Sequence, residues 1–363
     1  MNHSTAPAPT YRLDQSYEAN IAAGPRFDGP WPDIIDTPLK SFFGFPVRSR
    51  FGVAAGILGN SRWISAYSRL GFDILTFKTI RSETRLCGTP PNWMWLDPDS
   101  LAGGIDDPER PLVIGGQTPS TLSDWSLGGS FGIPSLEPAV WRDEIRAARA
   151  SLRDAQVLIV SVVGTAHPHT TEDEIVADFA ALAREAVECG AHLVEANLSC
   201  PNVGKREGQI FLDTELSIRI ARAVRDAVGS VPVLLKVGEL RDEESIARFL
   251  AGVAGLADGV VLMNSPARRM VRADQGPYFP PGREVAGVTG AAVKPIALRA
   301  IRQASALIRR HGYPLQIVGV GGVITPADAR DFIDAGACAA LAVTGAAMNP
   351  WLADSVKRQM PEL

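Results

Sequence analysis

The sequence predicts a (β/α)8 or TIM barrel, an α/β fold in which eight parallel strands close into a cylinder surrounded by helices. Short runs rich in β-branched and aliphatic residues recur along the chain, and segments with helical periodicity separate them. The runs are almost continuously apolar, as expected for strands that are covered on both faces. Eight such runs occur, which is the strand count of this barrel.

Each element follows from local signals. The strands are expected at residues 51–55, 73–78, 157–163, 192–198, 231–237, 259–264, 315–320 and 338–343. Thr171 and Glu174 form a capping-box pattern before the fourth strand, and Gly190 can close the helix that they open. Two further helices are expected over residues 243–256, after Asp242, and over residues 327–335, after Thr325 and Pro326.

Two segments lie outside the eight units. Residues 1–40 are rich in Pro, Gly and polar side chains and predict an irregular N-terminal arm, followed by a small β element near residues 42–47. Residues 81–138 are too long for a simple connection between a strand and a helix, so we expect an insertion that serves as a lid or an interface. The chain then divides into the arm and a barrel over residues 41–363.

The composition excludes several classes of protein. A net charge of −4 gives no reason to expect a polyanionic partner such as nucleic acid. The cysteines, Cys87, Cys189, Cys200 and Cys338, form no CxxC pair and have no zinc-site spacing, so we expect no metal and no disulfide framework. No run suits a membrane span or a secretory leader, and a cytoplasmic protein is expected.

Glycine pairs follow the last two predicted strands. Gly321-Gly322 and Thr344-Gly345 stand where such barrels commonly bind phosphate through backbone N–H groups. The alternative is that the glycines only make tight turns. Because both pairs end adjacent strands, we favour a phosphate site, which several barrel isomerases would also satisfy.

Cationic and amide side chains also stand at strand ends. Lys78 and Lys236 could each stabilise negative charge on a ligand or cofactor, although a single lysine in such a place often reaches solvent. Asn197, Asn202 and Asn264 offer donors and acceptors that suit a flat polar ring, although any one of them could merely cap a loop.

Cys200 is the candidate general base. It follows a strand end and precedes a loop over residues 201–213 that could close over a ligand and exclude water. A thiolate can accept a proton when local donors lower the pKa of the thiol. Inert packing is the usual role of a lone cysteine, and we assign that role to the other three.

The strand-end motifs carry a family resemblance. The most specific block is Asn197-Leu-Ser-Cys-Pro-Asn202, and supporting blocks stand at residues 51–56 (FGVAAG), 77–79 (FKT), 235–237 (LKV), 263–265 (MNS), 287–295 (GVTGAAVKP), 318–322 (VGVGG) and 344–345 (TG). From about residue 43 onward the chain resembles the FMN-dependent dihydroorotate dehydrogenase family, which includes the flavin and pyrimidine domain of dihydropyrimidine dehydrogenase.

The resemblance implies FMN lying across the barrel mouth and a pyrimidine beside it. FMN would be held by Ala55, Gly56, Lys78, Thr79, Asn197, Lys236, Gly290, Gly321, Gly322, Thr344 and Gly345. The pyrimidine would be held by Lys78, Ser130, Phe131, Gly132, Asn197, Asn202, Asn264 and Ser265. Cys200 would take a proton from the substrate carbon while hydride passes to flavin N5, and Lys78 and Lys236 would stabilise the charge that develops.

Two features depart from the family or extend it. Gly129 stands where the family normally has an asparagine that contacts the pyrimidine, and Ser130 could take over part of that role. Arg268 and Arg269, after the sixth strand, either recognise a substrate carboxylate or form an exposed basic loop.

The leading hypothesis is a cytoplasmic FMN oxidoreductase that acts on the CH–CH bond of a dihydropyrimidine, with dihydroorotate to orotate as the first choice. One alternative is the same chemistry on another dihydropyrimidine or lactam ring, and another is a barrel that binds a phosphate ligand without redox chemistry. A small-molecule substrate and a possible homodimer complete the expectation. The electron acceptor is left open between fumarate, NAD through a partner, quinone and oxygen.

Overall fold

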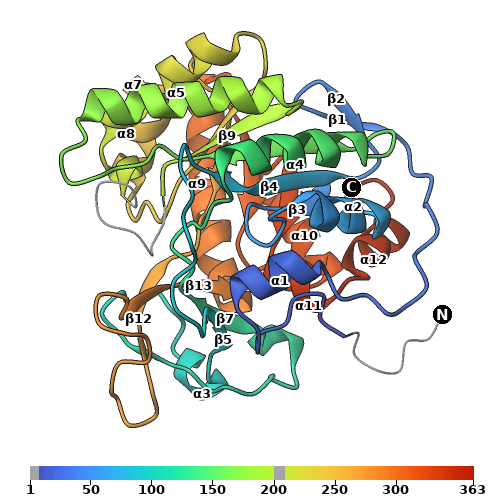
Figure 1. The fold of residues 1–363 in the computed structure, drawn as a ribbon, viewed down its shortest axis with the longest axis vertical. Helices are drawn as coiled ribbons and strands as arrows, with labels where there is room; N and C mark the ends of the chain where they lie inside the picture. Colours follow the sequence, from blue (N-terminus) through green and yellow to red (C-terminus); the bar gives the residue numbers. More distant parts are fainter. Residues whose placement is uncertain (1–7, 200–208) are drawn as a thin grey trace.

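A closed barrel of eight parallel strands forms the centre of the molecule (Figure 1). The computed structural model describes residues 8–199 and 209–363. The barrel strands are β3 (Phe51–Val53), β4 (Ile74–Ile80), β8 (Val157–Val162), β9 (Leu193–Asn197), β10 (Val233–Lys236), β11 (Gly259–Leu262), β14 (Gln316–Val320) and β15 (Ala339–Ala342). They pair in this order, with β15 closing onto β3, so all eight predicted strands and the predicted barrel are confirmed.

The barrel interior divides into an apolar part and a polar part. Its lower layers are filled by aliphatic side chains such as Ile159, Leu234 and Leu341. A hairpin of β1 (Lys40–Phe42) and β2 (Phe45–Val47) adds Phe42 and Val47 to this cluster, and so covers the amino ends of the strands. The small β element expected near residues 42–47 is this hairpin.

Helices surround the barrel on its outer side. They are α2 (Ser61–Arg69), α4 (Pro138–Ala150), α5 (Glu172–Glu188), α7 (Thr214–Val228), α8 (Glu243–Val253), α9 (Lys294–His311), α10 (Pro326–Asp334), α11 (Thr344–Met348) and α12 (Leu352–Gln359). The predicted capping box of Thr171 and Glu174 opens α5, and Asp242 and Thr325 cap α8 and α10 as expected. Helix α8 ends earlier than predicted, because Ala254 adopts an extended backbone (φ −59°, ψ 126°).

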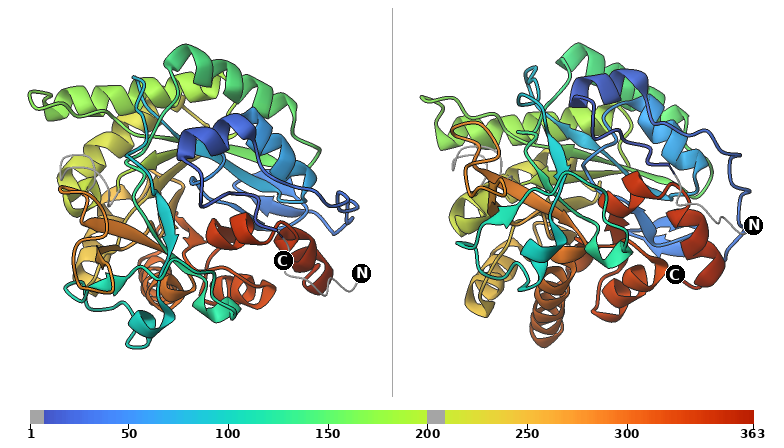
Figure 2. Two further views of the ribbon diagram at one scale, coloured as in Figure 1. Left: turned by 60° about the horizontal axis from the view of Figure 1, so that its bottom comes forward. Right: turned by 90° about the horizontal axis from the view of Figure 1, so that it is seen from below.

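Residues 81–138 contribute strands to a second sheet. This sheet has the order β5 (Trp93–Trp95), β7 (Ser126–Gly129), β13 (Val285–Gly290), β12 (Ala267–Val271) and β6 (Leu112–Val113). Three of its strands come from the insertion after β4 and two from the segment between β11 and β14. Figure 2 shows these teal and orange segments lying together across one end of the barrel.

The sequence predicts an irregular N-terminal arm, but the structure shows a short helix within it. Helix α1 (Tyr17–Ala23) begins at Ser16, whose side chain accepts a hydrogen bond from the backbone N–H of Ala19. The indole of Trp63 on α2 donates to the carbonyl of Asn20, which ties the arm to the barrel. This short helix depends on such tertiary contacts, because isolated helices of this length are not stable in water.

Within the part of the chain that the structure describes, no helix is both long enough and apolar enough to cross a lipid bilayer.

Candidate active site

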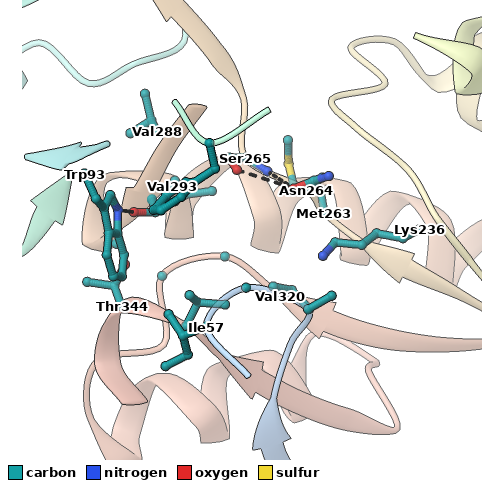
Figure 3. Close-up of a pocket in the computed structure, with 18 of the residues that line it drawn as sticks. Ile57, Trp93, Lys236, Met263, Asn264, Ser265, Val288, Val293, Val320 and Thr344 are labelled. Carbon is teal, nitrogen blue, oxygen red and sulfur yellow. Dashed lines mark hydrogen bonds between the residues drawn. The ribbon is translucent and has the colours of Figure 1, made fainter. Parts of the chain in front are cut away.

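A cavity opens at the carboxyl ends of the barrel strands, between the barrel and the second sheet (Figure 3). Its empty volume is about 980 Å³, including the solvent at its open mouth. Most of the predicted site residues line it together: Ala55, Gly56, Lys78, Thr79, Phe131, Gly132, Asn197, Lys236, Asn264, Ser265, Gly290, Gly321, Gly322 and Thr344. Residues more than 250 positions apart in the chain therefore share one site.

The turn after β14 has no room for side chains. Gly321 and Gly322 have φ values of +119° and +97°, which L-residues rarely adopt. A Cβ atom on Gly322 would lie 2.7 Å from the backbone nitrogen of Lys294, the first residue of α9. Two glycines in succession thus let the backbone approach both α9 and whatever occupies the cavity. This exposed backbone suits an anionic group such as phosphate.

Thr344 stands beside this turn with an unused hydroxyl. It is the first residue of α11 and is 3% exposed, and its Oγ1 atom has no hydrogen-bond partner among the described residues. A buried hydroxyl without a partner carries a free-energy cost of about 1–3 kcal/mol. A ligand oxygen in the cavity would remove that cost.

Gly290 lines the cavity for a different reason. Its φ is +93°, and a Cβ atom there would lie 2.0 Å from the carbonyl oxygen of Trp125. Close packing of the insertion against β13 therefore requires glycine at this position.

Both predicted lysines border the cavity. Lys236 ends β10, is 3% exposed, and directs its ammonium group toward the middle of the cavity (Figure 3). No described residue forms an ion pair or hydrogen bond with that ammonium group. Lys78 on β4 lies over two aromatic rings, with Nζ 5.6 Å from the ring centre of Phe131 and 5.9 Å from that of Tyr17. Helix α1 of the arm therefore contributes Tyr17 to the surroundings of a site lysine.

A hydrogen-bonded group of amides and hydroxyls forms another side of the cavity. The Asn197 amide donates to Thr79 Oγ1 at 3.3 Å, and Thr79 shares a 3.0 Å hydrogen bond with Ser161. The Asn264 amide donates to the carbonyl of Ser199 at 2.5 Å. These bonds fix the orientation of the two asparagines, so their positions are set before any ligand binds.

Trp93 forms a wall that the sequence did not reveal as part of the site. It lies opposite Gly129 in the pairing of β5 with β7, and its indole N–H donates to Thr289 Oγ1 at 2.9 Å. A Cβ atom on Gly129 would lie 3.1 Å from Trp93 Cδ1 and 3.3 Å from Phe131 Cε2. The indole thus occupies the space beside Gly129 that a larger residue would need.

Two predicted site residues point elsewhere. Ser130 is buried outside the cavity, and its hydroxyl accepts a hydrogen bond from Arg283 Nε at 3.0 Å. Gly345 does not line the cavity either, because it packs against the loop after β14, where a Cβ atom would lie 2.3 Å from the carbonyl of Val323. Cys200 and Asn202 lie outside the described residues.

Both expectations for Arg268 are wrong. Its side chain is buried away from the cavity, where Nη1 pairs with Glu239 at 3.0 Å and Nε donates to the carbonyl of Ile105 at 2.8 Å. It therefore joins β12 to the insertion. Its neighbour Arg269 is exposed.

Apolar residues complete the cavity. Sequence reasoning missed Ile57, Ile133, Met263, Val288, Val293, Val320, Val323, Ile324 and Val343. Nothing in the sequence distinguishes such side chains from ordinary core residues. Together with the polar groups they make a pocket with apolar faces, one buried cation and an anion-binding end, which suits a flat heteroaromatic ring that carries a phosphate.

Cys87 lies near Lys78 but is not a candidate base. Burial, and to a smaller extent the nearby Glu18, raise the pKa of its thiol to about 12, so the thiol stays protonated at neutral pH. The described residues also hold no group of three or more His, Cys, Asp or Glu side chains that could bind a metal ion.

Comparison with known proteins agrees with this geometry. The family model for dihydroorotate dehydrogenase matches residues 130–363. Dihydroorotate dehydrogenase of Dictyostelium discoideum is 32% identical over 364 residues, which cover 95% of each chain. The catalytic subunit of the NAD(+)-linked dihydroorotate dehydrogenase B of Staphylococcus carnosus is 29% identical over 171 residues, 47% of this chain and 53% of that one.

A solved structure shares the fold. The dihydroorotate dehydrogenase of Eimeria tenella, crystallised with ferulenol, superposes with a TM-score of 0.71 at 17% identity, over 91% of this chain and 86% of that one. The match of the family model to most of the chain, and the match to the Dictyostelium enzyme along nearly all of it, show that this chain belongs to the dihydroorotate dehydrogenase family.

Proposed function

We propose that this oxidoreductase converts dihydroorotate to orotate, with FMN bound across the barrel mouth as the electron acceptor. The observation that carries the proposal is the combination of a buried lysine and a glycine turn in one cavity. Lys236 supplies a buried cation that makes no ion pair with a described residue, and Gly321-Gly322 supplies exposed backbone in the same cavity.

The residues present fit FMN. The phosphate would lie against the Gly321-Gly322 turn and the unpartnered hydroxyl of Thr344. The isoalloxazine ring would lie between the apolar side chains of the cavity, with its polar edge toward Lys236 and Asn197. Bound there, FMN supplies a two-electron acceptor.

The chain's own groups would hold the substrate and the charge. Asn197 and Asn264 present fixed amides for the carbonyl and N–H groups of a pyrimidine, and Ser265 lies next to them on the cavity surface. Lys78, held over two aromatic rings, would stabilise negative charge on the substrate or the cofactor. Trp93 would exclude water from the side of the cavity formed by the second sheet.

We assign the general base to Cys200, which directly follows Ser199 in the chain. The assignment rests on the family resemblance of the block Asn197–Asn202. Cys200→Ala should keep bound FMN but lose most of the flavin reduction by dihydroorotate, measured anaerobically by stopped-flow absorbance. Reduction at the rate of the unmodified enzyme would remove Cys200 from this role.

One anaerobic experiment tests the proposed function. The purified protein should show flavin absorbance, which dihydroorotate bleaches and dihydrouracil does not. A colourless protein that binds no added FMN would refute the redox reading. A flavoprotein that dihydrouracil bleaches in preference to dihydroorotate would refute the substrate.

A further inference from the structure

A buried carboxyl group inside the barrel has no role in the function proposed so far. Glu195 on β9 is 0% exposed, and neither of its carboxylate oxygens has a hydrogen-bond partner among the described residues. Its neighbours Val194 and Ala196 belong to the outer core, whereas Leu193 belongs to the interior cluster. Because side chains alternate along a strand, Glu195 points into the barrel, one inward position below Asn197.

The surroundings of Glu195 are polar on one side of the barrel only. The adjacent strands β4, β8, β9 and β10 supply the inward-facing side chains of Thr76, Thr79, Ser161, Glu195, Asn197 and Lys236. The other four strands supply apolar side chains at the same depth, among them Ala54, Val261, Val318 and Leu341. The charged group that faces Glu195 from the described strands is therefore Lys236, because Lys78 lies over the rings of Tyr17 and Phe131 instead.

Strand pairing brings Glu195 close to Lys236. Glu195 lies opposite Leu234 on β10, and Lys236 lies opposite Asn197. Lys236 is therefore one inward position above Glu195 on the neighbouring strand, at a Cα separation of roughly 8 Å from the strand spacing and rise. On the other side, Glu195 lies opposite Ser161, whose hydroxyl is bonded to Thr79 at the cavity surface.

Burying a lone carboxylate or a lone ammonium group costs free energy, and this cost falls when the two groups lie close together. Lys236 directs its ammonium group into the cavity and makes no direct ion pair within 4 Å with a described residue. A carboxylate at Glu195 would balance it from below while the cavity holds a neutral ring. When negative charge develops on that ring, the ring balances Lys236 from above. The charge on the ring and a charge on the Glu195 carboxylate would then repel each other.

We propose that Glu195 is the buried counter-charge of Lys236 and takes up one proton when the bound flavin is reduced to its anion. This inference rests on the function proposed above. The balance is complete: two electrons and one proton pass from dihydroorotate to the flavin as hydride, the second substrate proton passes to Cys200 and from there to solvent, and the Glu195 carboxylate takes up one proton from solvent. Glu195 acts through Lys236 and is a positioning residue.

The number of protons taken up per two electrons tests this directly. The flavin midpoint potential is measured against pH with dithionite and an indicator dye, so that no substrate is needed. Each coupled proton changes the two-electron equilibrium tenfold per pH unit, which is about 30 mV. The wild-type holoenzyme should show about 59 mV per pH unit, from two such protons, and Glu195→Gln about 30 mV.

Thr76→Val is the matched control. Thr76 faces the same interior from β4, and its hydroxyl is also unpartnered, but its removal takes away no titratable group. Its slope should equal that of the wild type. Equal slopes for the wild type and Glu195→Gln would overturn the inference.

The remaining outcomes are distinguishable. If Glu195→Gln holds no flavin, the wild-type slope decides, and uptake of a single proton refutes the inference. A wild-type protein that binds no flavin refutes the proposed function and the inference together. A two-proton slope that Glu195→Gln abolishes, in a flavoprotein that dihydroorotate does not reduce, supports the inference and refutes only the substrate.

Discussion

Replacing Gly322 by alanine should weaken both the fold and the binding of FMN. The φ of +97° imposes strain on an L-residue, and the new Cβ would lie 2.7 Å from the backbone nitrogen of Lys294. Strain in the left-handed region costs about 1–2 kcal/mol, and overpacking adds about 1–3 kcal/mol. If the turn shifts enough to break one hydrogen bond to the phosphate, the loss of about 1.5–3 kcal/mol weakens FMN binding by about 10- to 150-fold.

Gly312→Ala is the matched control. Gly312 ends α9 with a φ of +66° and would have no heavy atom within 4 Å of an added Cβ. This variant should lose about 1 kcal/mol of unfolding free energy and keep its affinity for FMN. Denaturant unfolding of the apoproteins and quenching of FMN fluorescence on titration measure the two quantities. Equal FMN affinities in the two variants would refute the role of the Gly322 turn.

Three further substitutions test the cavity wall and contacts elsewhere in the fold. Burial raises the pKa of Asp328, but the Lys294 ammonium group and backbone N–H donors outweigh burial and hold that pKa below its usual range. The ionised Asp328 therefore stabilises the fold above about pH 4, and this contribution is lost in acid. Asp328→Asn should therefore lower the unfolding free energy by about 1–3 kcal/mol at neutral pH, and a deficit that persists in acid would contradict this cause. Trp93→Phe removes one hydrogen bond from the cavity wall and should raise KM for dihydroorotate by about 5-fold with little change in kcat. A fall in kcat alone would show that Trp93 does not help to bind the substrate. Arg268→Met leaves the partly buried Glu239 with only the more distant Arg241, at 3.6 Å, as an ion-pair partner. It should cost about 1–3 kcal/mol in denaturant unfolding without changing KM, whereas a raised KM in a fully stable variant would show that Arg268 binds the substrate carboxylate.

The sequence was sufficient to predict the barrel because its strands are buried on both faces. That burial leaves unbroken apolar runs such as the one over residues 157–160, which are distinctive. The polar residues after these runs identified the site, because a parallel barrel brings all its carboxyl strand ends to one mouth. Lys78, Lys236 and Gly321-Gly322 were found by this argument.

The second sheet could not be predicted in the same way. Its strands are two to six residues long and pair with partners far away in the sequence, as β7 does with β13. Such short strands carry little periodicity. Arg268 was misread for the same reason, since its burial depends on Ile105 and Glu239, which lie in other segments. Helix α1 was missed because its stability comes from contacts such as the one between Trp63 and Asn20.

The pairing of β7 with β13 also affects how the chain acquires its fold during synthesis. The bond between Trp93 and Thr289 joins residues 196 positions apart, so one edge of β7 has no partner until the ribosome has made β13. An unpaired strand edge is a template for association with other chains. We therefore expect nascent or refolding chains to aggregate most readily while β5 and β7 await β13, and slower, colder refolding at low concentration to increase the yield of holoenzyme.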